Sequence, residues 1–227
     1  MMAREKLRLA VLISGGGSNL AAIARACAQG QIDAQIVQVI ADRGTAGGIE
    51  LAKSMGLPTT LLEFSRYPSR EDHERAIIAT IEESDAQLVV LAGYMRVLSA
   101  AFVSKFLGRL LNVHPSLLPK YKGLHTHRRV LEAGEREHGA SVHFVSVDLD
   151  GGPIICQARV PVLPGDTEQT LAARVLTREH RIYPKVVGLI AAGRVRLHGD
   201  RVLLDGQPLA IPLNDNDSPM MPQQRHA

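Results

Sequence analysis

Short runs of branched apolar residues recur through the first half of the chain, and stretches with helical spacing separate them. Each run is too short for a buried helix and has the composition of a strand that is covered on both faces. Strands that alternate with helices in this way predict an α/β fold with a doubly wound, mostly parallel sheet. The predicted strands are residues 7–13, 35–40, 59–62, 88–91 and 110–113.

Glycine-rich or polar segments follow three of these predicted strands. Residues 15–17 come after the first strand, residues 93–96 follow the fourth, and residues 112–114 end the fifth. In doubly wound sheets, ligands bind in the crevice beyond the carboxyl ends of the strands. The sequence therefore predicts that these three segments meet at one edge of the sheet and form a binding site there.

The second half of the chain departs from this alternation. Residues 141–147 and 154–160 have the pattern of two strands, which we expect to be antiparallel. A long helix is predicted from Thr167, and Pro184 is expected to kink or interrupt it. The turn-forming pair Gly199-Asp200 lies between two short apolar runs and predicts a small hairpin.

Length and composition indicate one folded domain. Hydrophobic residues make up 45% of the 227 residues and charged residues 22%, so the chain can bury a proper core. We assign residues 1–211 to this single domain. Residues 212–227 contain Pro, Asn, Asp and Gln without a periodic apolar pattern, which predicts a flexible C-terminal tail.

Charge and cysteine content narrow the classes of partner. The net charge is +3, and the Lys and Arg residues are scattered, whereas a nucleic-acid binder carries them in a stripe. Small anionic substrates therefore fit better than nucleic acid. Cys27 and Cys156 form neither a CxxC pair nor a disulfide framework, which favours a cytoplasmic protein. We expect either a monomer or a homodimer. No apolar run approaches the ~20 residues that a membrane span needs.

Two polar side chains, Asn112 and His114, lie at the end of the fifth predicted strand, directly before Pro115. Residues two apart in a strand point to the same face of the sheet. An asparagine amide can donate a hydrogen bond to an oxyanion, and a histidine can move a proton near neutral pH. An isolated Asn-x-His is more often the plain end of a strand, so the catalytic interpretation depends on the other segments.

Three consecutive glycines, residues 15–17, connect the first strand to the first helix. Without Cβ atoms they allow close approach of a ligand, and the amides of Gly17, Ser18 and Asn19 would point from a helix N-terminus toward an anion. A phosphate group is the natural ligand, although such turns are also often purely structural. The dinucleotide fingerprint does not fit, because its last glycine would fall at Leu20.

Asp150 precedes two glycines, whose flexibility would let its carboxylate project into a cleft. Near His114, this carboxylate would favour the imidazolium by charge and hydrogen bonding, which makes the histidine a better acid. On its own, Asp150 also fits an ordinary turn. His125 and His127 do not complete the spacing of a closed ligand set, so we expect loop histidines that line an anionic pocket, and no metal.

The combination of these segments resembles one known family. Over nearly its whole length the chain is similar to the phosphoribosylglycinamide formyltransferases, which are folate-dependent enzymes of purine biosynthesis with a Rossmann-like fold. The Asn-x-His-Pro-Ser-Leu-Leu-Pro segment alone marks the wider formyltransferase superfamily, and the full set is far more specific. The matching stretches are residues 13–20, 91–98, 112–119, 123–127, 141–144 and 148–152.

The resemblance implies transfer of a formyl group from 10-formyltetrahydrofolate, a co-substrate, to the primary amine of glycinamide ribonucleotide, without a metal. It implies a catalytic set of Asn112, His114 and Asp150. The residues implied to bind the ribonucleotide are Gly17, Ser18 and Asn19 at its phosphate, and Leu176, Thr177, Arg178 and Glu179, with Glu179 at its ribose. The residues implied to bind the folate are Arg70, Met95, Arg96, Val97, Leu98, Asn112, Ser146, Val147, Asp148, Leu149 and Asp150.

Other activities remain as alternatives. Formyltetrahydrofolate deformylase, a hydrolase, shares the fold and much of the catalytic core. It resembles a version of this chain to which an N-terminal domain has been added. Methionyl-tRNA formyltransferase carries an additional C-terminal domain, and we expect none here because the part after Gly193 is short and not strongly basic. A non-catalytic nucleotide-binding module would use only the glycine turn, and would leave Asn112, His114 and Asp150 unexplained as a group.

Overall fold

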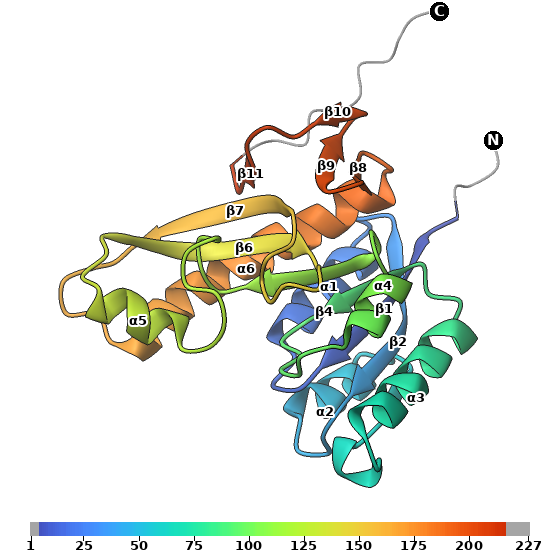
Figure 1. Cartoon of the computed structure of the whole chain (residues 1–227). Coiled ribbons are helices and arrows are strands. Elements are labelled where there is room, and N and C mark those ends of the chain that lie inside the picture. Colours follow the sequence, from blue (N-terminus) through green and yellow to red (C-terminus); the bar gives the residue numbers. More distant parts are fainter. Residues whose placement is uncertain (1–4, 217–227) are drawn as a thin grey trace, which may run out of the picture.

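The computed structural model describes residues 5–216, which fold around an eight-stranded sheet (Figure 1). The strand order is β11-β7-β6-β5-β4-β1-β2-β3, and the first five strands of the chain are parallel to one another. β6 runs antiparallel to both of its neighbours, β5 and β7. The predicted doubly wound, mostly parallel sheet is therefore confirmed. These strands are β1 (Leu7–Ile13), β2 (Ala34–Ala41), β3 (Thr59–Leu61), β4 (Leu88–Leu91), β5 (Leu110–His114), β6 (Glu137–Phe144) and β7 (Ile154–Pro161).

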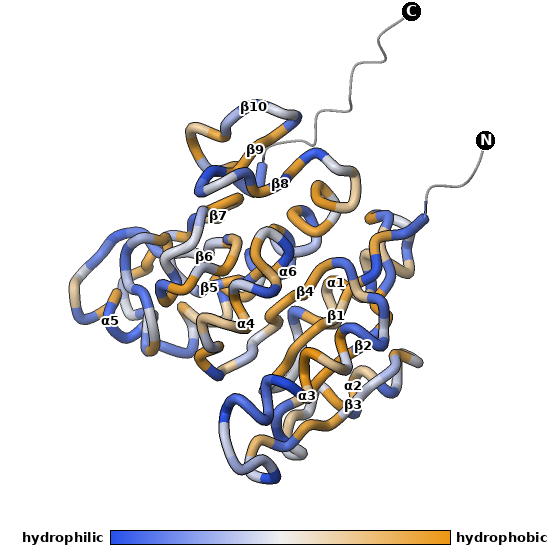
Figure 2. The backbone as a smooth tube through the Cα atoms, turned by 45° about the vertical axis from the view of Figure 1, so that its right-hand side comes forward, coloured by the Kyte–Doolittle hydropathy of each residue, from blue (hydrophilic) through white to orange (hydrophobic). Residues whose placement is uncertain are grey.

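Helices cover both faces of this sheet. In β1, Leu9 and Val11 pack toward one helix layer, while Ala10 and Leu12 pack toward the other, as the two-residue period of a strand requires. Figure 2 shows hydrophobic stretches concentrated in the central strands and hydrophilic ones in the outer turns. The first layer contains α1 (Ser18–Ala28), α2 (Gly47–Ser54), α5 (Thr126–Glu132) and α6 (Glu168–Ala191), and the second contains α3 (Arg70–Glu83) and α4 (Ala100–Lys105).

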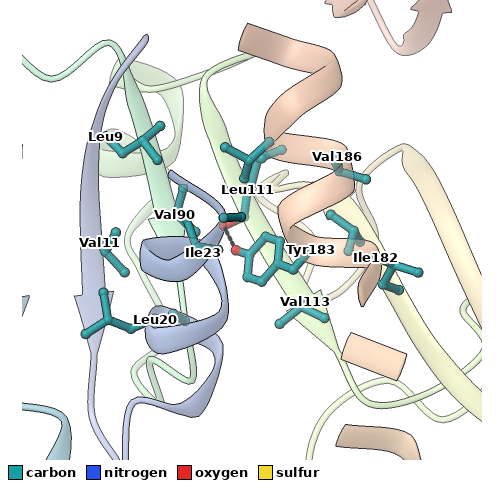
Figure 3. Close-up of a cluster of buried hydrophobic side chains, with 14 of the residues drawn as sticks. Leu9, Val11, Leu20, Ile23, Val90, Leu111, Val113, Ile182, Tyr183 and Val186 are labelled. Carbon is teal, nitrogen blue, oxygen red and sulfur yellow. Dashed lines mark hydrogen bonds between the residues drawn. The ribbon is translucent and has the colours of Figure 1, made fainter. Parts of the chain in front are cut away.

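The long helix α6 packs against the centre of the sheet and is hydrogen-bonded to it. The Tyr183 side chain is fully buried, and its hydroxyl oxygen lies 3.0 Å from the carbonyl oxygen of Leu91 and 3.2 Å from that of Leu111. Figure 3 shows this ring among apolar side chains of α1, β4 and β5. α6 is continuous through the buried Pro184, so the predicted interruption does not occur. Packing of the residues around Pro184 outweighs the missing backbone donor.

Most predicted boundaries agree with the structure, and β6 differs most. It was expected at residues 141–147, but it begins at Glu137 and ends at Phe144. Gly139 lies inside the strand, because a Cβ atom there would approach the carbonyl oxygen of Ala158 to 1.9 Å. A glycine that normally indicates a turn is required here by the close approach of β7. The N-cap of α3 is Ser69, whose hydroxyl accepts a hydrogen bond from the backbone N–H of Asp72 at 3.0 Å.

The C-terminal part contains the predicted hairpin and two short strands that were not predicted. β8 (Val195–His198), β9 (Arg201–Leu204) and β10 (Gln207–Pro208) form a separate small sheet. β11 (Leu213–Asn214) adds to the edge of the main sheet, in parallel with β7. This start of the segment 212–227 differs from the flexible tail that the sequence predicted, and residues 217–227 lie outside the described part. None of the helices within residues 5–216 has the length and apolar character to cross a membrane.

Candidate active site

The carboxyl ends of β1, β4 and β5 meet at one edge of the sheet, as predicted. The strand order reverses between β1 and β4, which makes this edge the switch point at which doubly wound sheets bind ligands. Two hydrogen bonds join the segments directly. The backbone N–H of Ser14 donates to the carbonyl of Gly93 at 3.2 Å, and that of Met95 donates to the Ser14 hydroxyl at 3.0 Å.

The three candidate catalytic residues come together at this edge. His114 ends β5 and is buried, and its Nδ1 lies 3.3 Å from Oδ2 of Asp150. Its Nε2 lies 2.9 Å from the carbonyl oxygen of Tyr121. Both partners of the ring are acceptors, so the imidazolium, with an N–H on each nitrogen, has a partner for both. Asn112 lies two residues earlier on the same strand.

The Asp150 carboxylate is held by the backbone around it. Asp150 has a backbone φ of 47°, and its Oδ2 accepts a hydrogen bond from the N–H of Gly123 at 2.9 Å. The following glycines were expected to supply flexibility. Instead, Gly152 permits a close approach, because a Cβ atom there would lie 1.9 Å from the carbonyl oxygen of Phe144. The loop is thereby seated against β6, and the Asp150 side chain is only 8% exposed.

His143 is a functional candidate that the sequence analysis did not single out. It pairs with Asn112 across β5 and β6, and its Nε2 lies 3.3 Å from Nδ2 of Asn112. Its Nδ1 donates to the carbonyl of Phe144 at 2.9 Å, so Nε2 accepts from the amide. Burial is the main cause that lowers the pKa of His143, which keeps the ring neutral and able to orient Asn112. The strand alternation around residue 143 was the signal that could have indicated this role.

The glycine turn presents free backbone donors. Gly17 precedes α1 with a φ of 76°, and a Cβ atom there would lie 2.8 Å from Cα of Gly48. Within the described residues, the backbone N–H groups of Gly17, Ser18 and Asn19 have no hydrogen-bond partner, and no acidic side chain occupies the first turn. Free N–H groups at the positive end of a helix dipole favour an anion such as phosphate.

Of the four residues expected from α6, Glu179 is the one that contacts this turn. Its Oε2 accepts a hydrogen bond from the Asn19 amide at 2.7 Å, and burial raises the pKa of its carboxyl group. Thr177 donates to a carbonyl of its own helix, and Arg178 pairs with Asp215 at 2.8 Å. Leu176 lies on the same helix with a partly buried side chain. Among the described residues, the hydrogen bond that joins this set to the turn is the one between Asn19 and Glu179.

A hollow of about 290 Å³ lies beside the end of β4 and contains five of the expected folate-binding residues. Met95 and Val97 are large hydrophobic residues that are 64% and 60% exposed. Within the described chain, the backbone N–H groups of residues 96–98 have no hydrogen-bond partner. Apolar surface beside free backbone donors suits a flat heterocycle with polar edges. The hollow is lined by Phe64, Arg70, His73, Glu74, Tyr94, Met95, Arg96, Val97 and Leu98.

The other expected folate segment, residues 146–150, adds further exposed apolar surface. Val147 and Leu149 are 64% and 55% exposed. The Ser146 hydroxyl donates to the carbonyl oxygen of Asp148 at 3.2 Å, so these two stabilise the loop itself. Asp150 is the member of this segment whose side chain reaches His114, the candidate catalytic histidine.

A larger cavity of about 850 Å³ lies elsewhere, between α1 and α6. It is lined by Arg25, His180, Pro184 and Arg194 among others, and by none of the three candidate catalytic residues. Arg194 is paired with Asp205 at 2.7 Å. We therefore place the active site by its chemistry and not by cavity size. Between residues 5 and 216, no cluster of three or more His, Cys, Asp or Glu side chains is placed to hold a metal ion.

Comparison with known proteins agrees with this geometry. Residues 7–187 match the formyl transferase family. The chain is 52% identical over 203 residues to the phosphoribosylglycinamide formyltransferase of Escherichia coli (strain K12), which covers 89% of this chain and 96% of that relative. The chain belongs to the phosphoribosylglycinamide formyltransferase family. The solved structure of the phosphoribosylglycinamide formyltransferase from Coxiella burnetii superposes on this enzyme with a TM-score of 0.88 and 50% identity, over 92% of this chain and 99% of the other.

A hydrolase shares the same fold. The crystal structure of a formyltetrahydrofolate deformylase from Pseudomonas putida KT2440 has a TM-score of 0.81 to this formyltransferase at 27% identity. The match covers 90% of this chain and 72% of the deformylase chain. The fold alone therefore does not separate transfer from hydrolysis.

Proposed function

We propose that this enzyme transfers the formyl group of 10-formyltetrahydrofolate to the amine of glycinamide ribonucleotide, and releases formylglycinamide ribonucleotide and tetrahydrofolate. One observation carries the proposal: the contact between His114 and Asp150 lies at the same edge of the sheet as a free helix N-terminus and a hollow with free backbone donors. The first can hold a phosphate, and the second can hold a pterin.

In this proposal the two substrates approach the catalytic residues from different strands. The ribonucleotide phosphate binds the N–H groups of Gly17, Ser18 and Asn19, and its ribose meets the Glu179 carboxyl group. The pterin lies against residues 95–98 and the 146–150 loop. Arg70 lines the same hollow with a half-exposed side chain, which makes it a suitable partner for the carboxylates of the folate tail.

The proposed chemistry is a nucleophilic acyl transfer. The amine of the ribonucleotide attacks the formyl carbon, and a C–N bond forms as the bond to N10 of the folate breaks. The tetrahedral oxyanion accepts hydrogen bonds from the Asn112 amide and from protonated His114. Removal of one such donor typically costs about 3 to 4 kcal/mol of transition-state stabilisation. Asp150 keeps the imidazolium charged and, through a water molecule, helps the proton move from the amine to N10.

The segment between β5 and α5 is proposed to exclude bulk water from this reaction. Two of its backbone groups already contact the catalytic residues, since the Tyr121 carbonyl faces His114 and the Gly123 N–H binds Asp150. Closure over the site would limit hydrolysis of the formyl donor. This is the property that would separate a transferase from the deformylase.

We further propose that the enzyme works in the cytoplasm, with small molecules as its partners, as a monomer or a homodimer, and without a metal. The sequence contains only two cysteines, Cys27 and Cys156, without a CxxC pair or a disulfide framework, and this supports a reducing compartment. The absence of a basic stripe in the sequence supports small-molecule substrates over nucleic acid.

The test is release of tetrahydrofolate from 10-formyltetrahydrofolate by the purified protein, with and without glycinamide ribonucleotide. Release that depends on the ribonucleotide, with an equal amount of formylated product, is the expected result. Release that ignores the ribonucleotide would show a hydrolase. No release in either case would support a nucleotide-binding module without catalysis.

A further inference from the structure

A buried carboxylate near the folate hollow has no role in the mechanism above. Asp42 follows β2, and its side chain is fully buried. Its Oδ2 accepts a hydrogen bond from Nε of Arg96 at 2.6 Å, whereas its Oδ1 has no hydrogen-bond partner within residues 5–216. Nε of Arg43 lies 3.6 Å from Oδ1. Burial of a carboxylate with one unsatisfied oxygen is costly, which makes a plain stabilising role a weak explanation.

Arg96, the partner of Asp42, is also held by the ring of Phe64. The guanidinium carbon of Arg96 lies 3.7 Å from the centre of the Phe64 ring, which is a cation–π contact. Phe64 opens the short 3₁₀ helix η1 (Phe64–Arg66), and its backbone N–H donates to the carbonyl of Asp42 at 3.1 Å. Asp42 and Phe64 therefore form one unit that holds the Arg96 side chain.

Arg96 itself belongs to the segment 95–98, which lines the hollow. The two ends of this segment are anchored by hydrogen bonds. Met95 donates to the Ser14 hydroxyl, and the N–H of Ser99 donates to Oε1 of Glu74 at 2.8 Å. Between these ends the backbone N–H groups of residues 96–98 are unpaired within the described structure. The polar tether in the middle is thus the Arg96 side chain, and its strongest partner is the Asp42 carboxylate.

We propose that Asp42 is a positioning residue for the folate co-substrate. Through Arg96 it fixes the course of residues 95–98, so that their free backbone donors and the exposed side chains of Met95 and Val97 are already placed when the pterin arrives. A segment that is fixed before binding loses less conformational entropy in the complex. The inference rests on the proposed function, because it assigns folate to this hollow.

The test compares Michaelis constants for the two substrates. In Asp42→Asn the side-chain shape stays the same, but the charge that holds Arg96 is lost. We expect the KM for 10-formyltetrahydrofolate to rise about tenfold, which corresponds to one weakened charge-assisted hydrogen bond. The KM for glycinamide ribonucleotide and kcat are expected to stay within about twofold, since neither the glycine turn nor His114 is altered. Arg96→Gln should give the same pattern, and the double variant should add little to either single change.

A matched control is Asp205→Asn, which removes the same charge from an ion pair with Arg194 on the small C-terminal sheet. It should leave the KM for folate unchanged. An unchanged folate KM in Asp42→Asn would overturn the inference. An equal rise in KM for both substrates would also overturn it, because it would show general damage to the fold.

Calorimetric binding of 5-formyltetrahydrofolate, a stable isomer of the donor, separates the positioning role of Asp42 from the proposed function. Tight binding by the native protein and equal binding by Asp42→Asn would overturn only the positioning role, whereas no binding by the native protein would also overturn the assignment of folate to the hollow.

Discussion

Both ring nitrogens of His114 face hydrogen-bond acceptors, and one of these is the Asp150 carboxylate at 3.3 Å. Asp150→Asn keeps the shape of that side chain but removes the charge that favours the imidazolium. We expect kcat to fall about 100-fold or more, by analogy with the loss of one oxyanion donor. Steady-state kinetics of both proteins check this, and a kcat close to that of the native protein would remove Asp150 from the catalytic set.

Gly17 has a different kind of constraint, which is steric. Its φ of 76° disfavours any L side chain, and an added Cβ atom would lie 2.8 Å from Cα of Gly48. Gly17→Ala should therefore destabilise the protein by about 1 to 3 kcal/mol and raise the KM for glycinamide ribonucleotide. Gly16→Ala is the matched control, because its Cβ would meet no atom within 4 Å. Denaturant unfolding and substrate kinetics measure both effects, and equal behaviour of the two variants would contradict the argument.

At the scale of elements, β11 is held to the main sheet through α6. Asp215 pairs with Arg178 at 2.8 Å and lies 3.8 Å from Arg181, and its side chain is only 10% exposed. Asp215→Asn is expected to lower the free energy of unfolding by about 1 kcal/mol, at the upper end of the range for exposed pairs. Asp200→Asn should change nothing, since that carboxylate is 95% exposed and 3.9 Å from Arg201. Urea unfolding of both variants checks this, and a loss in Asp200→Asn of the same size would show that burial is not the cause.

The same elements show what the sequence could predict. The apolar character of a strand is a local property, so β1 and β4 agree with the sequence prediction. β11 has only two residues and no period to detect, and it exists because α6 and β7 offer it partners. The missed Asp42–Arg96 contact joins residues 54 positions apart, and no local pattern encodes such a pair.

For the whole molecule, strand order explains why the position of the site could be predicted from the sequence. Residues 15–19, 93–98 and 112–114 are distant in sequence, but they lie at the carboxyl ends of β1, β4 and β5, which are adjacent in the sheet. Once a parallel sheet is predicted, its carboxyl edge must collect them. His143 was missed because it lies on β6, the one reversed strand of the main sheet among the described residues, where the same edge is reached from the opposite direction.

Buried neutral histidines govern how the stability of the whole protein should depend on pH. Burial is the largest cause that lowers the pKa of each of five histidines, and for His138, which is 1% exposed, it lowers the pKa to about 4. The unfolded chain takes up these protons near pH 6.5, before the folded chain does, so folding becomes less favourable as the pH falls. Glu179 acts in the opposite direction, since burial raises its pKa. The five are His73, His127, His138, His143 and His180.

We therefore predict that the free energy of unfolding is nearly constant above pH 7 and falls steadily between about pH 6.5 and pH 4. His138 alone should contribute up to about 3 kcal/mol of that fall, because its pKa drops from 6.5 to about 4 on folding. Urea unfolding followed by circular dichroism at several pH values measures the effect. In His138→Gln the slope should be shallower, whereas in His198→Gln, at an exposed position of β8, it should stay as in the native protein. A slope that is the same in all three proteins would mean that the neutral state of His138 is not what makes the fold sensitive to acid.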